Sequence, residues 1–377
     1  MRSYHNSIFY LIINSYGKGG AESANVHLAN ALAALGKDVH LIILKGSSRP
    51  NNMHHNVMLH SFHLDALSAR HVSSGKDAAV LKMAGLIEET SIVGSTILSY
   101  AVISSLPLAN KICSFLEPSK VYYWLHFPVT YSDLKGRNWF RRFYRKLRLK
   151  RLYMGRNIIC PSFGVLEDFD SLFPEGIYRK AKVIYNPVDL FKIFTLSSDT
   201  TSAKVGPNPF FLHAARFVPQ KRHDRLIYAY KLFLEKTAAQ IDLVCIGDGM
   251  LFDENMKLVA ELGLNDRVHF LGFQKNPFPF MSKAKALILS SDFEAMGMVL
   301  VESLSLGTPC VSTNCPHGPN EILIDDLEQC LTQMNPESLA DGMLRVWENP
   351  PDVSGYDLSR FDPKVVAQQY IDFLQAG

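Results

Sequence analysis

Two glutamates set eight residues apart suggest the chemistry of this sequence. In the stretch EAMGMVLVE, Glu294 follows an apolar strand pattern and Glu302 lies within a helical pattern. Carboxylates bind vicinal hydroxyls, and a helix beginning near Gly297 offers N–H groups to phosphate oxygens. Eight helical residues rise about 12 Å, so the two carboxylates can address both ends of one elongated ligand. A ligand with hydroxyls at both ends and a diphosphate between them is a nucleotide sugar.

Two cations are predicted at the same sheet edge as Glu294. Arg216 and Lys221 lie between the strand pattern PFFLHAAR and a helical pattern. Cations in such a loop can neutralise a diphosphate and stabilise the leaving group as its bond breaks. Gly247, in IGDGM, ends another strand pattern and either allows a ligand close to the backbone or forms a tight turn.

A glycine loop in the first half also suits phosphate binding. GKGGAES joins a strand pattern to a helical pattern, but Gly17, Gly19 and Gly20 do not form GxGxxG, because Glu22 stands at the last glycine position. An NAD-dependent oxidoreductase requires that loop. This class of enzyme is therefore disfavoured.

Strand and helix patterns alternate along the whole chain, which predicts an α/β fold with parallel sheets. In the first half the strand patterns are SIFYLIIN, VHLIILK, VYYWLHF and NIICPS, and AESANVHLANALAALG is the first crossover helix. The segment from Asn186 to Pro209 has the composition of a linker. We expect an N-terminal domain at 1–187, a second domain at 188–360, and a helix at 361–377 that packs back on the first domain.

Length and composition fit two globular domains. The 377 residues are 47% apolar and 20% charged, which is typical of folded proteins with ordinary cores. The longest apolar runs are far shorter than the roughly 18 residues of a membrane-spanning helix. The six cysteines show neither CxxC pairs nor a compact framework. A reduced, cytoplasmic setting is therefore predicted.

A basic segment at 135–156 holds ten Lys and Arg residues and no acid, although the whole chain carries only +3. Trp139, Phe143 and Leu147 give it one apolar face. Two hypotheses stay open: a helix lying on an anionic membrane surface, or a core-packed helix with a solvated basic face. No nucleic-acid-binding motif accompanies the charge, so nucleic acid is not an expected partner. The cations assigned to a membrane or acceptor contact are Arg141, Arg142, Arg145 and Arg148.

Taken together, several motifs resemble the family-four retaining glycosyltransferases. The motifs are GGAES at 19–23, WLHFP at 124–128, CPSFGVLEDF at 160–169, VIYNPVD at 183–189, ARFVPQKRHDRLI at 215–227, and EAMGMVLVESLSLGTPCVSTNCPHGPNEIL from Glu294 onward. Their order and spacing cover nearly the whole chain. The resemblance implies the GT-B fold, in which an acceptor-binding and a nucleotide-sugar-binding Rossmann-like domain face each other.

The resemblance also implies a role for each matched residue. Glu294 would hold the donor sugar's hydroxyls near the reacting carbon, and Glu302 would bind the ribose. Arg216 and Lys221 would neutralise the diphosphate. The remaining matched residues are Gly297 and Met298 as backbone amides at the helix start, Gly19 and Gly20 in the loop under the donor phosphates and beside the acceptor, and His126 near the sugar's C6 end. Gly247 is also expected to bind the donor, although GDGM replaces the GDGP that is common in the family.

The implied reaction moves a sugar from a nucleotide diphosphate to an acceptor hydroxyl with retention, without a metal ion, a cofactor or a protein nucleophile. A UDP-sugar is favoured as donor. The stretch CPHGPNEIL is most similar to enzymes of bacterial cell-surface polysaccharides, so the expected acceptor is a lipid-linked or lipopolysaccharide glycan at the inner face of the membrane. The family usually has glycine where this chain has Ala295, which affects the expected sugar rather than the activity. The alternative function is a nucleotide-sugar 2-epimerase of the same fold.

Two further patterns are poor metal sites. The DFD stretch at 168–170 has the D-x-D form of some metal–nucleotide sites, but it falls in a helical pattern, where a helix surface is expected. Five histidines of one region have no convincing acid partner, so a solvated loop is expected there. These histidines are His54, His55, His60, His63 and His71.

Overall fold

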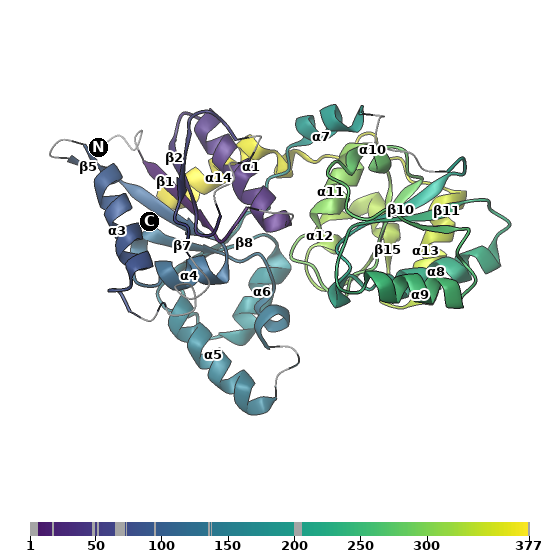
Figure 1. Cartoon of the computed structure of the whole chain (residues 1–377), viewed down its shortest axis with the longest axis horizontal. Helices are drawn as coiled ribbons and strands as arrows, with labels where there is room; N and C mark the ends of the chain where they lie inside the picture. Colours follow the sequence, from purple (N-terminus) through teal and green to yellow (C-terminus); the bar gives the residue numbers. More distant parts are fainter. Residues whose placement is uncertain are drawn as a thin grey trace. The chain divides into compact units, whose positions relative to one another are not determined.

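The chain folds into two compact units, seen in a computed structural model (Figure 1). One unit comprises Met1–Pro187 with Arg360–Gly377, and the other comprises Val188–Ser359. Each unit contains one parallel sheet, which confirms the predicted α/β class. Gly17 and His71 lie outside the described residues. The structure describes residues 7–16, 19–46, 50, 53–64, 72, 74–93, 96–134, 136, 138–199 and 206–375.

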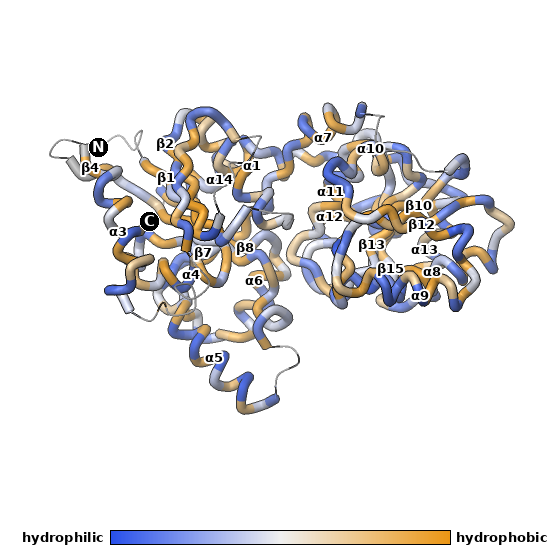
Figure 2. Tube along the Cα trace, in the orientation of Figure 1, coloured by the Kyte–Doolittle hydropathy of each residue, from blue (hydrophilic) through white to orange (hydrophobic). Residues whose placement is uncertain are grey.

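The first unit is built on a seven-stranded sheet. Its strands form because their apolar residues run nearly without interruption, as in IFYLII of β1, where every side chain is buried. Figure 2 shows this apolar centre. Across the sheet the order is β3 (Val57–Ser61), β2 (Asp38–Ile43), β1 (Ile8–Ile13), β6 (Tyr100–Ser104), β7 (Val121–Trp124), β8 (Asn157–Cys160) and β9 (Lys180–Val183).

Successive aromatic residues of β7 point to opposite faces of this sheet and contact different helices. The ring of Trp124 lies 5.5 Å from that of Tyr370 in α14 (Pro363–Gln375), which packs beside α1 (Gly20–Ala34). On the other face the Tyr123 ring lies 5.6 Å from that of Tyr153 in α5 (Trp139–Tyr153). The C-terminal helix therefore belongs to the core of the first unit. Other described elements of this unit include α3 (Ala78–Ser91), α4 (Pro107–Cys113), α6 (Phe163–Leu172) and the small antiparallel pair β4 (Ile92–Val93) and β5 (Thr96–Ile97).

The second unit contains a six-stranded parallel sheet. Its strand order is β12 (Val268–Phe270), β11 (Asp242–Ile246), β10 (Phe210–Ala214), β13 (Ala286–Leu289), β14 (Cys310–Thr313) and β15 (Leu331–Thr332). Its helices are α7 (Leu190–Ser197), α8 (His223–Lys236), α9 (Phe252–Glu261), α10 (Phe278–Met281), α11 (Met298–Ser305), α12 (Pro319–Ile322) and α13 (Pro336–Glu348). Because β10 pairs with β11 on one side and β13 on the other, the connections diverge at its carboxyl end. Ligands of doubly wound sheets bind at such a switch point.

The segment predicted as a linker is partly helical. Asp189 caps α7, and its side chain accepts a hydrogen bond from Lys192 N at 3.0 Å. The buried Ile193 and the packing of α7 against α10 and α11 fix this helix in the second unit. The Ser, Thr, Pro and Gly content of the whole segment therefore misled the prediction for residues 190–197, which are themselves mostly apolar. No helix of the described residues combines the length and the apolar character needed to cross a membrane.

Candidate functional site

The switch point of the second sheet brings Lys221 and Glu294 into direct contact. Lys221 follows β10 and Glu294 follows β13, and Lys221 Nζ lies 2.5 Å from Glu294 Oε1. Only 16% of the lysine side chain and 9% of the glutamate side chain are exposed. Ser291 Oγ donates a second hydrogen bond to the same Oε1 at 2.6 Å. A mostly buried carboxylate and ammonium thus neutralise each other at the sheet edge where ligands bind.

A network of backbone and side-chain bonds fixes the two loops that carry this pair. Asp292 N donates to Gln220 O at 2.8 Å, and Gln220 Nε2 donates to Phe293 O at 2.7 Å. Arg225 in α8 binds the Asp292 carboxylate at 2.7 Å, and Arg222 reaches the same carboxylate at 3.2 Å. Because both loops are tied to each other, the ion pair is held in position before any ligand binds.

The helix start predicted near Gly297 is present. Gly297 adopts a left-handed conformation with φ of 86°, and α11 begins at Met298. The first N–H groups of a helix lack partners one turn earlier, so they can bind an anion. In α11, Leu300 N already donates to Gly297 O at 2.9 Å. Glu302 lies in the second turn of α11 and is half-buried. Burial raises the pKa of Glu302 to about 7, so its carboxyl changes charge near neutral pH.

The Arg216 loop is supported by Gly247. Arg216 is exposed just beyond β10, and its neighbour Ala215 donates its N–H to Ile246 O at 3.0 Å. Gly247 has φ of 139°, and a Cβ there would lie 1.9 Å from Ala215 O. The glycine therefore allows the loops after β10 and β11 to approach each other. A contact of Gly247 with a ligand stays a prediction.

Replacing Gly247 by alanine is expected to destabilise the second unit by about 3 kcal/mol, because the new Cβ would overlap the Ala215 carbonyl and strain the backbone. Thermal denaturation of the purified variant measures this loss. Gly355→Ala is the matched control, since a Cβ at Gly355 meets no atom within 4 Å. Equal melting temperatures for Gly247→Ala and wild type would contradict this interpretation.

Two buried histidines beneath this site were not identified from the sequence. His213 in β10 hydrogen-bonds through Nδ1 to Ile288 O at 2.7 Å. The His223 ring stacks on Phe217, with ring centroids 3.8 Å apart, and meets His213 edge-on at 4.5 Å. Burial lowers the pKa of His213 to about 4 and that of His223 to about 2. Both rings are therefore neutral at physiological pH.

In the first unit His126 follows β7 and is buried. Its Nε2 lies 3.4 Å from Asn25 Nδ2 in α1, and Ser105 Oγ donates to Asn25 Oδ1 at 2.8 Å. Burial lowers the pKa of His126 to about 3. The imidazole is thus a neutral, fixed group, and Asn25 and Ser105 are partners that the sequence analysis missed.

The predicted glycine loop leads into the same helix. Gly19 is the N-cap residue of α1, and Gly20 is its exposed first residue. A Cβ at Gly19 would lie 2.1 Å from Glu22 Oε2, so the side chain of Glu22 folds back over the helix start. A role for these glycines in binding phosphate stays a prediction.

The basic segment forms α5, and the predicted apolar face of this helix is exposed rather than core-packed. The exposed fraction is 70% for Trp139, 55% for Phe143 and 41% for Leu147. The hypothesis that this apolar face packs into the core is therefore wrong. Arg141, Arg142 and Arg148 are also exposed, whereas Arg145 is paired with Asp133.

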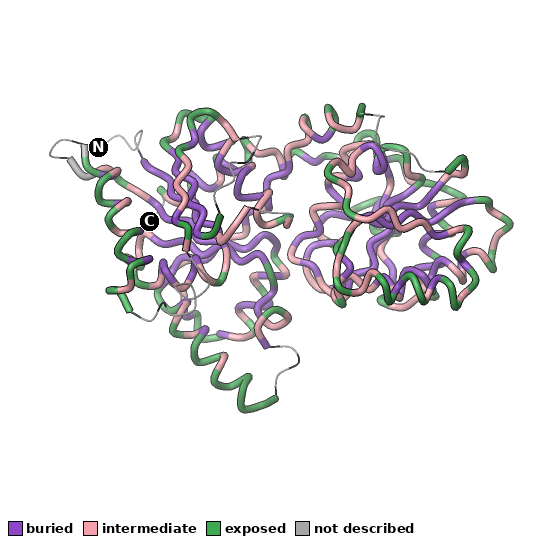
Figure 3. Tube along the Cα trace, in the orientation of Figure 1, coloured by how far each residue is buried: buried purple, intermediate pink, exposed green. Residues whose placement is uncertain are grey.

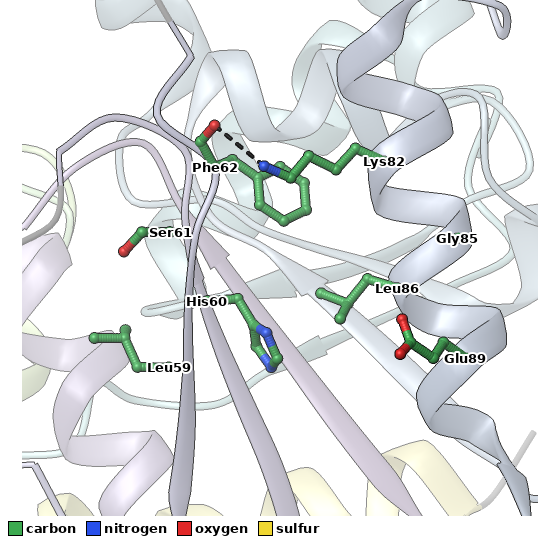
Figure 4. Close-up of a pocket in the computed structure, with 8 residues that line it drawn as sticks. All are labelled: Leu59, His60, Ser61, Phe62, Lys82, Gly85, Leu86 and Glu89. Atoms are coloured by element: carbon green, nitrogen blue, oxygen red, sulfur yellow. Dashed lines mark hydrogen bonds between the residues drawn. The ribbon is translucent and has the colours of Figure 1, made fainter.

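A pocket of about 500 Å³ lies between β3 and α3, far along the chain from these motifs (Figure 4). His60 in β3 is half-buried and stacks on His40, with Nε2 to Nδ1 at 2.9 Å. The solvated loop expected for His60 is therefore wrong, because this residue belongs to the sheet. Lys82 Nζ donates to Phe62 O across the pocket at 3.4 Å. The pocket collects none of the predicted site residues.

The described residues contain no group of three or more His, Cys, Asp or Glu side chains placed to hold a metal ion. Asp168, predicted on a helix surface, is instead buried and accepts a hydrogen bond from Thr130 N at 3.0 Å. This carboxylate satisfies a backbone donor at the start of the π-helix Thr130–Leu134, which is a structural role.

Two family profiles match this chain in succession. Residues 18–191 match the profile described as Glycosyltransferase Family 4, and residues 198–356 match Glycosyl transferases group 1. A solved structure of HepE from Anabaena, in complex with UDP and glucose, superposes with a TM-score of 0.77 over 99% of this chain and all of that chain, at 19% identity. This likeness confirms the GT-B fold.

Two curated relatives show where the sequence similarity lies. The Campylobacter jejuni N-acetylgalactosamine-N,N'-diacetylbacillosaminyl-diphospho-undecaprenol 4-alpha-N-acetylgalactosaminyltransferase is 31% identical over 223 residues, or 59% of each chain. The lipopolysaccharide 1,6-galactosyltransferase of Escherichia coli K12 is 32% identical over 157 residues, or 40% of this chain and 41% of that protein. The matched part thus spans less than two thirds of either relative.

Proposed function

We propose a function for this chain from its family, since it belongs to the group 1 glycosyltransferases of the GT-B fold. It transfers a sugar from a UDP-sugar to a hydroxyl of a lipid-linked or lipopolysaccharide glycan, with retention of anomeric configuration. The observation that carries this proposal is the buried Lys221–Glu294 pair at the switch point of the second sheet, beside the start of α11.

Charge at this edge suits a diphosphate leaving group. An ammonium has three N–H donors, so the bond from Lys221 to Glu294 still allows it to bind phosphate oxygens. Arg216, exposed on the neighbouring loop, adds a second cation, and the N–H groups at the start of α11 add dipoles of the same sign. These groups stabilise the negative charge that builds on the phosphate as it departs.

The reaction then needs no further acid or base. The bond between the anomeric carbon and the β-phosphate oxygen breaks, and the acceptor oxygen forms a bond to that carbon from the same face. The acceptor's proton passes to the departing phosphate oxygen, so UDP and the glycoside are the only products. Glu294 accepts hydrogen bonds from sugar hydroxyls, and its partner Ser291 keeps the carboxylate oriented.

Names of similar proteins support the choice of substrates. HepE was solved with UDP and glucose, and the two curated relatives are named for lipid-linked and lipopolysaccharide acceptors. No relative reported above is named as an epimerase, and the epimerase alternative is not favoured.

All six cysteines are free thiols, which supports a reduced, cytoplasmic site of action.

Transfer can be tested with labelled UDP-sugars and lipids extracted from the native host. We expect label to enter the lipid fraction, and the anomeric proton of the product to show the donor's configuration by NMR. Glu294→Gln should abolish transfer. Absence of transfer from every UDP-sugar would overturn the proposal, and conversion of the donor without an acceptor would indicate an epimerase instead.

Donor affinity is expected to depend on pH through Glu302. Its carboxyl accepts hydrogen bonds from ribose hydroxyls best when ionised, and burial raises its pKa to about 7. Affinity for UDP-glucose should therefore rise several-fold from pH 6 to pH 8. Calorimetry over this range measures the effect, and Glu302→Gln should remove it. An equally steep rise in Glu302→Gln would refute this role.

A further inference from the structure

We propose that the exposed aromatic face of α5 docks this protein onto an anionic lipid bilayer. This proposal does not depend on which sugar is transferred, and it concerns a surface rather than the site described above. Figure 1 shows α5 extending from the body of the first unit, and Figure 3 shows that most of its length is exposed.

The aromatic face is a continuous cluster. Trp139 and Phe143 stack with ring centroids 6.4 Å apart, and Phe140 and Tyr144 stack at 6.1 Å. Phe143 and Tyr144 join the two pairs at 5.9 Å. Each of these four rings is more than half exposed. Contiguous exposed apolar surface of this kind marks an interaction site in a folded protein.

The helix is held by its C-terminal part. Leu149 and Tyr153 are its buried residues, and Tyr153 packs against Phe169 of α6 with ring centroids 5.1 Å apart. Asn138 caps the start of the helix through a hydrogen bond from Arg141 N at 3.0 Å. The aromatic cluster is therefore displayed on a helix that is anchored and capped.

The charge of α5 selects an anionic partner. Its fifteen residues include seven cations and no acid. Two cations form ion pairs, Arg145 with Asp133 and Lys150 with Glu175. Arg141, Arg142 and Arg148 are exposed around the aromatic cluster. Their guanidinium groups can reach lipid phosphates while the hydrocarbon stems lie over apolar surface.

Helices that lie in the headgroup region of a bilayer typically combine Trp, Tyr and Phe with Arg and Lys, as α5 does. A second copy of this chain fits less well, because a two-fold contact through α5 would set seven cations against the same seven. The surface thus matches a bilayer in both its apolar and its charged part. The glycan acceptor proposed above is attached to lipid, so such docking would place the enzyme at its substrate.

The test is co-sedimentation of the full chain with vesicles of phosphatidylcholine, alone or mixed with phosphatidylglycerol. We expect wild type to bind the mixed vesicles and not phosphatidylcholine alone. Each basic residue near an anionic surface strengthens binding about five-fold, so neutralising three should weaken it on the order of 100-fold. The charge variant is Arg141→Gln/Arg142→Gln/Arg148→Gln, which leaves the paired Arg145 in place.

The aromatic variant Trp139→Ser/Phe143→Ser should weaken binding at least about ten-fold, since it removes the groups that enter the headgroup region. Its matched control is Phe191→Ser/Phe194→Ser, because these two rings of α7 are also exposed. The charge-matched control is Lys257→Gln/Lys283→Gln/Lys285→Gln, which removes three exposed cations of the second unit. Both controls should bind vesicles like wild type.

Two results would overturn the proposal. One is vesicle binding by the aromatic variant that equals wild type. The other is a concentration-dependent dimer, detected by sedimentation velocity, that only the α5 variants lose, because the occupant would then be a second copy. The vesicles contain neither donor nor acceptor, and UDP-sugar affinity measured on the same variants should be unchanged. Failure of vesicle binding would therefore leave the proposed reaction intact.

Discussion

Lys221→Met is expected to lower kcat/KM for sugar transfer by about 1000-fold or more. The substitution removes a cation that would neutralise the leaving diphosphate. It also removes the hydrogen bond from Lys221 to the mostly buried Glu294 carboxylate. Of the two side-chain bonds described above, that from Ser291 is kept. An unpaired buried charge costs about 3 kcal/mol, so a lower melting temperature should accompany the lost activity. Steady-state kinetics and thermal denaturation measure the two effects.

The double variant Lys221→Met/Glu294→Gln separates the catalytic loss from the structural loss. It should recover stability relative to Lys221→Met, because no buried charge is left unpaired, but it should recover no activity. Lys257→Met, at an exposed position of the same unit, serves as control and should change neither quantity. A loss of activity below ten-fold in Lys221→Met would contradict the role given to this cation.

Acid is expected to destabilise the second unit through His213 and His223. The unfolded chain binds a proton at each histidine below about pH 6.5, whereas burial lowers their pKa in the folded unit to about 4 and about 2. Since the unfolded state binds more protons in that window, stability falls as pH falls. The loss between pH 6.5 and 4 should be on the order of 3 kcal/mol for each histidine.

Urea denaturation at several pH values, followed by hydrogen exchange in peptides from β10 and α8, measures this loss in the second unit. His223→Phe should flatten the pH dependence, because it removes one titrating group and keeps an aromatic ring against Phe217. His55→Gln, at an exposed position, should leave it unchanged. A pH dependence in His223→Phe as steep as that of wild type would show that other groups dominate.

The parallel sheets were largely predictable because their strands are continuous apolar runs. The apolar runs that form β1, β2, β7 and β8 are more continuous than the alternating pattern of a strand with one face exposed to solvent. By contrast, β6 at Tyr100–Ser104 was missed, since its few apolar residues are flanked by serines. The helix α7 was missed because the Ser, Thr, Pro and Gly residues after it dominate the composition of the segment. Its N-cap Asp189 is a local signal, whereas its packing on α10 and α11 is a tertiary feature.

The sequence predicted which residues lie at the candidate site, but not which of them contact each other. Motif order placed Lys221 and Glu294 at one sheet edge, yet their direct pairing depends on how the two loops are tied by Gln220 and Asp292. The one available signal for Ser291 was its position three residues before Glu294. No sequence pattern indicated a role for Asn25, because its contacts with Ser105 and His126 join residues far apart in the sequence.

The orientation of α5 also required the structure. Its periodicity showed an apolar face, but periodicity does not say whether such a face meets a core or solvent. Burial settled the question: Leu149 and Tyr153 anchor the helix, whereas Trp139 and Phe143 are exposed.

The most direct test of the central claim is calorimetric binding of a panel of nucleoside diphosphates and their sugars to wild type, Glu302→Ala and Arg216→Ala. We predict that uridine diphosphate and its sugars bind wild type, and that both variants lose this binding because the ribose and diphosphate contacts are gone. Absence of binding to every nucleotide, or binding that neither variant weakens, would contradict a nucleotide-sugar site at the switch point of the second sheet.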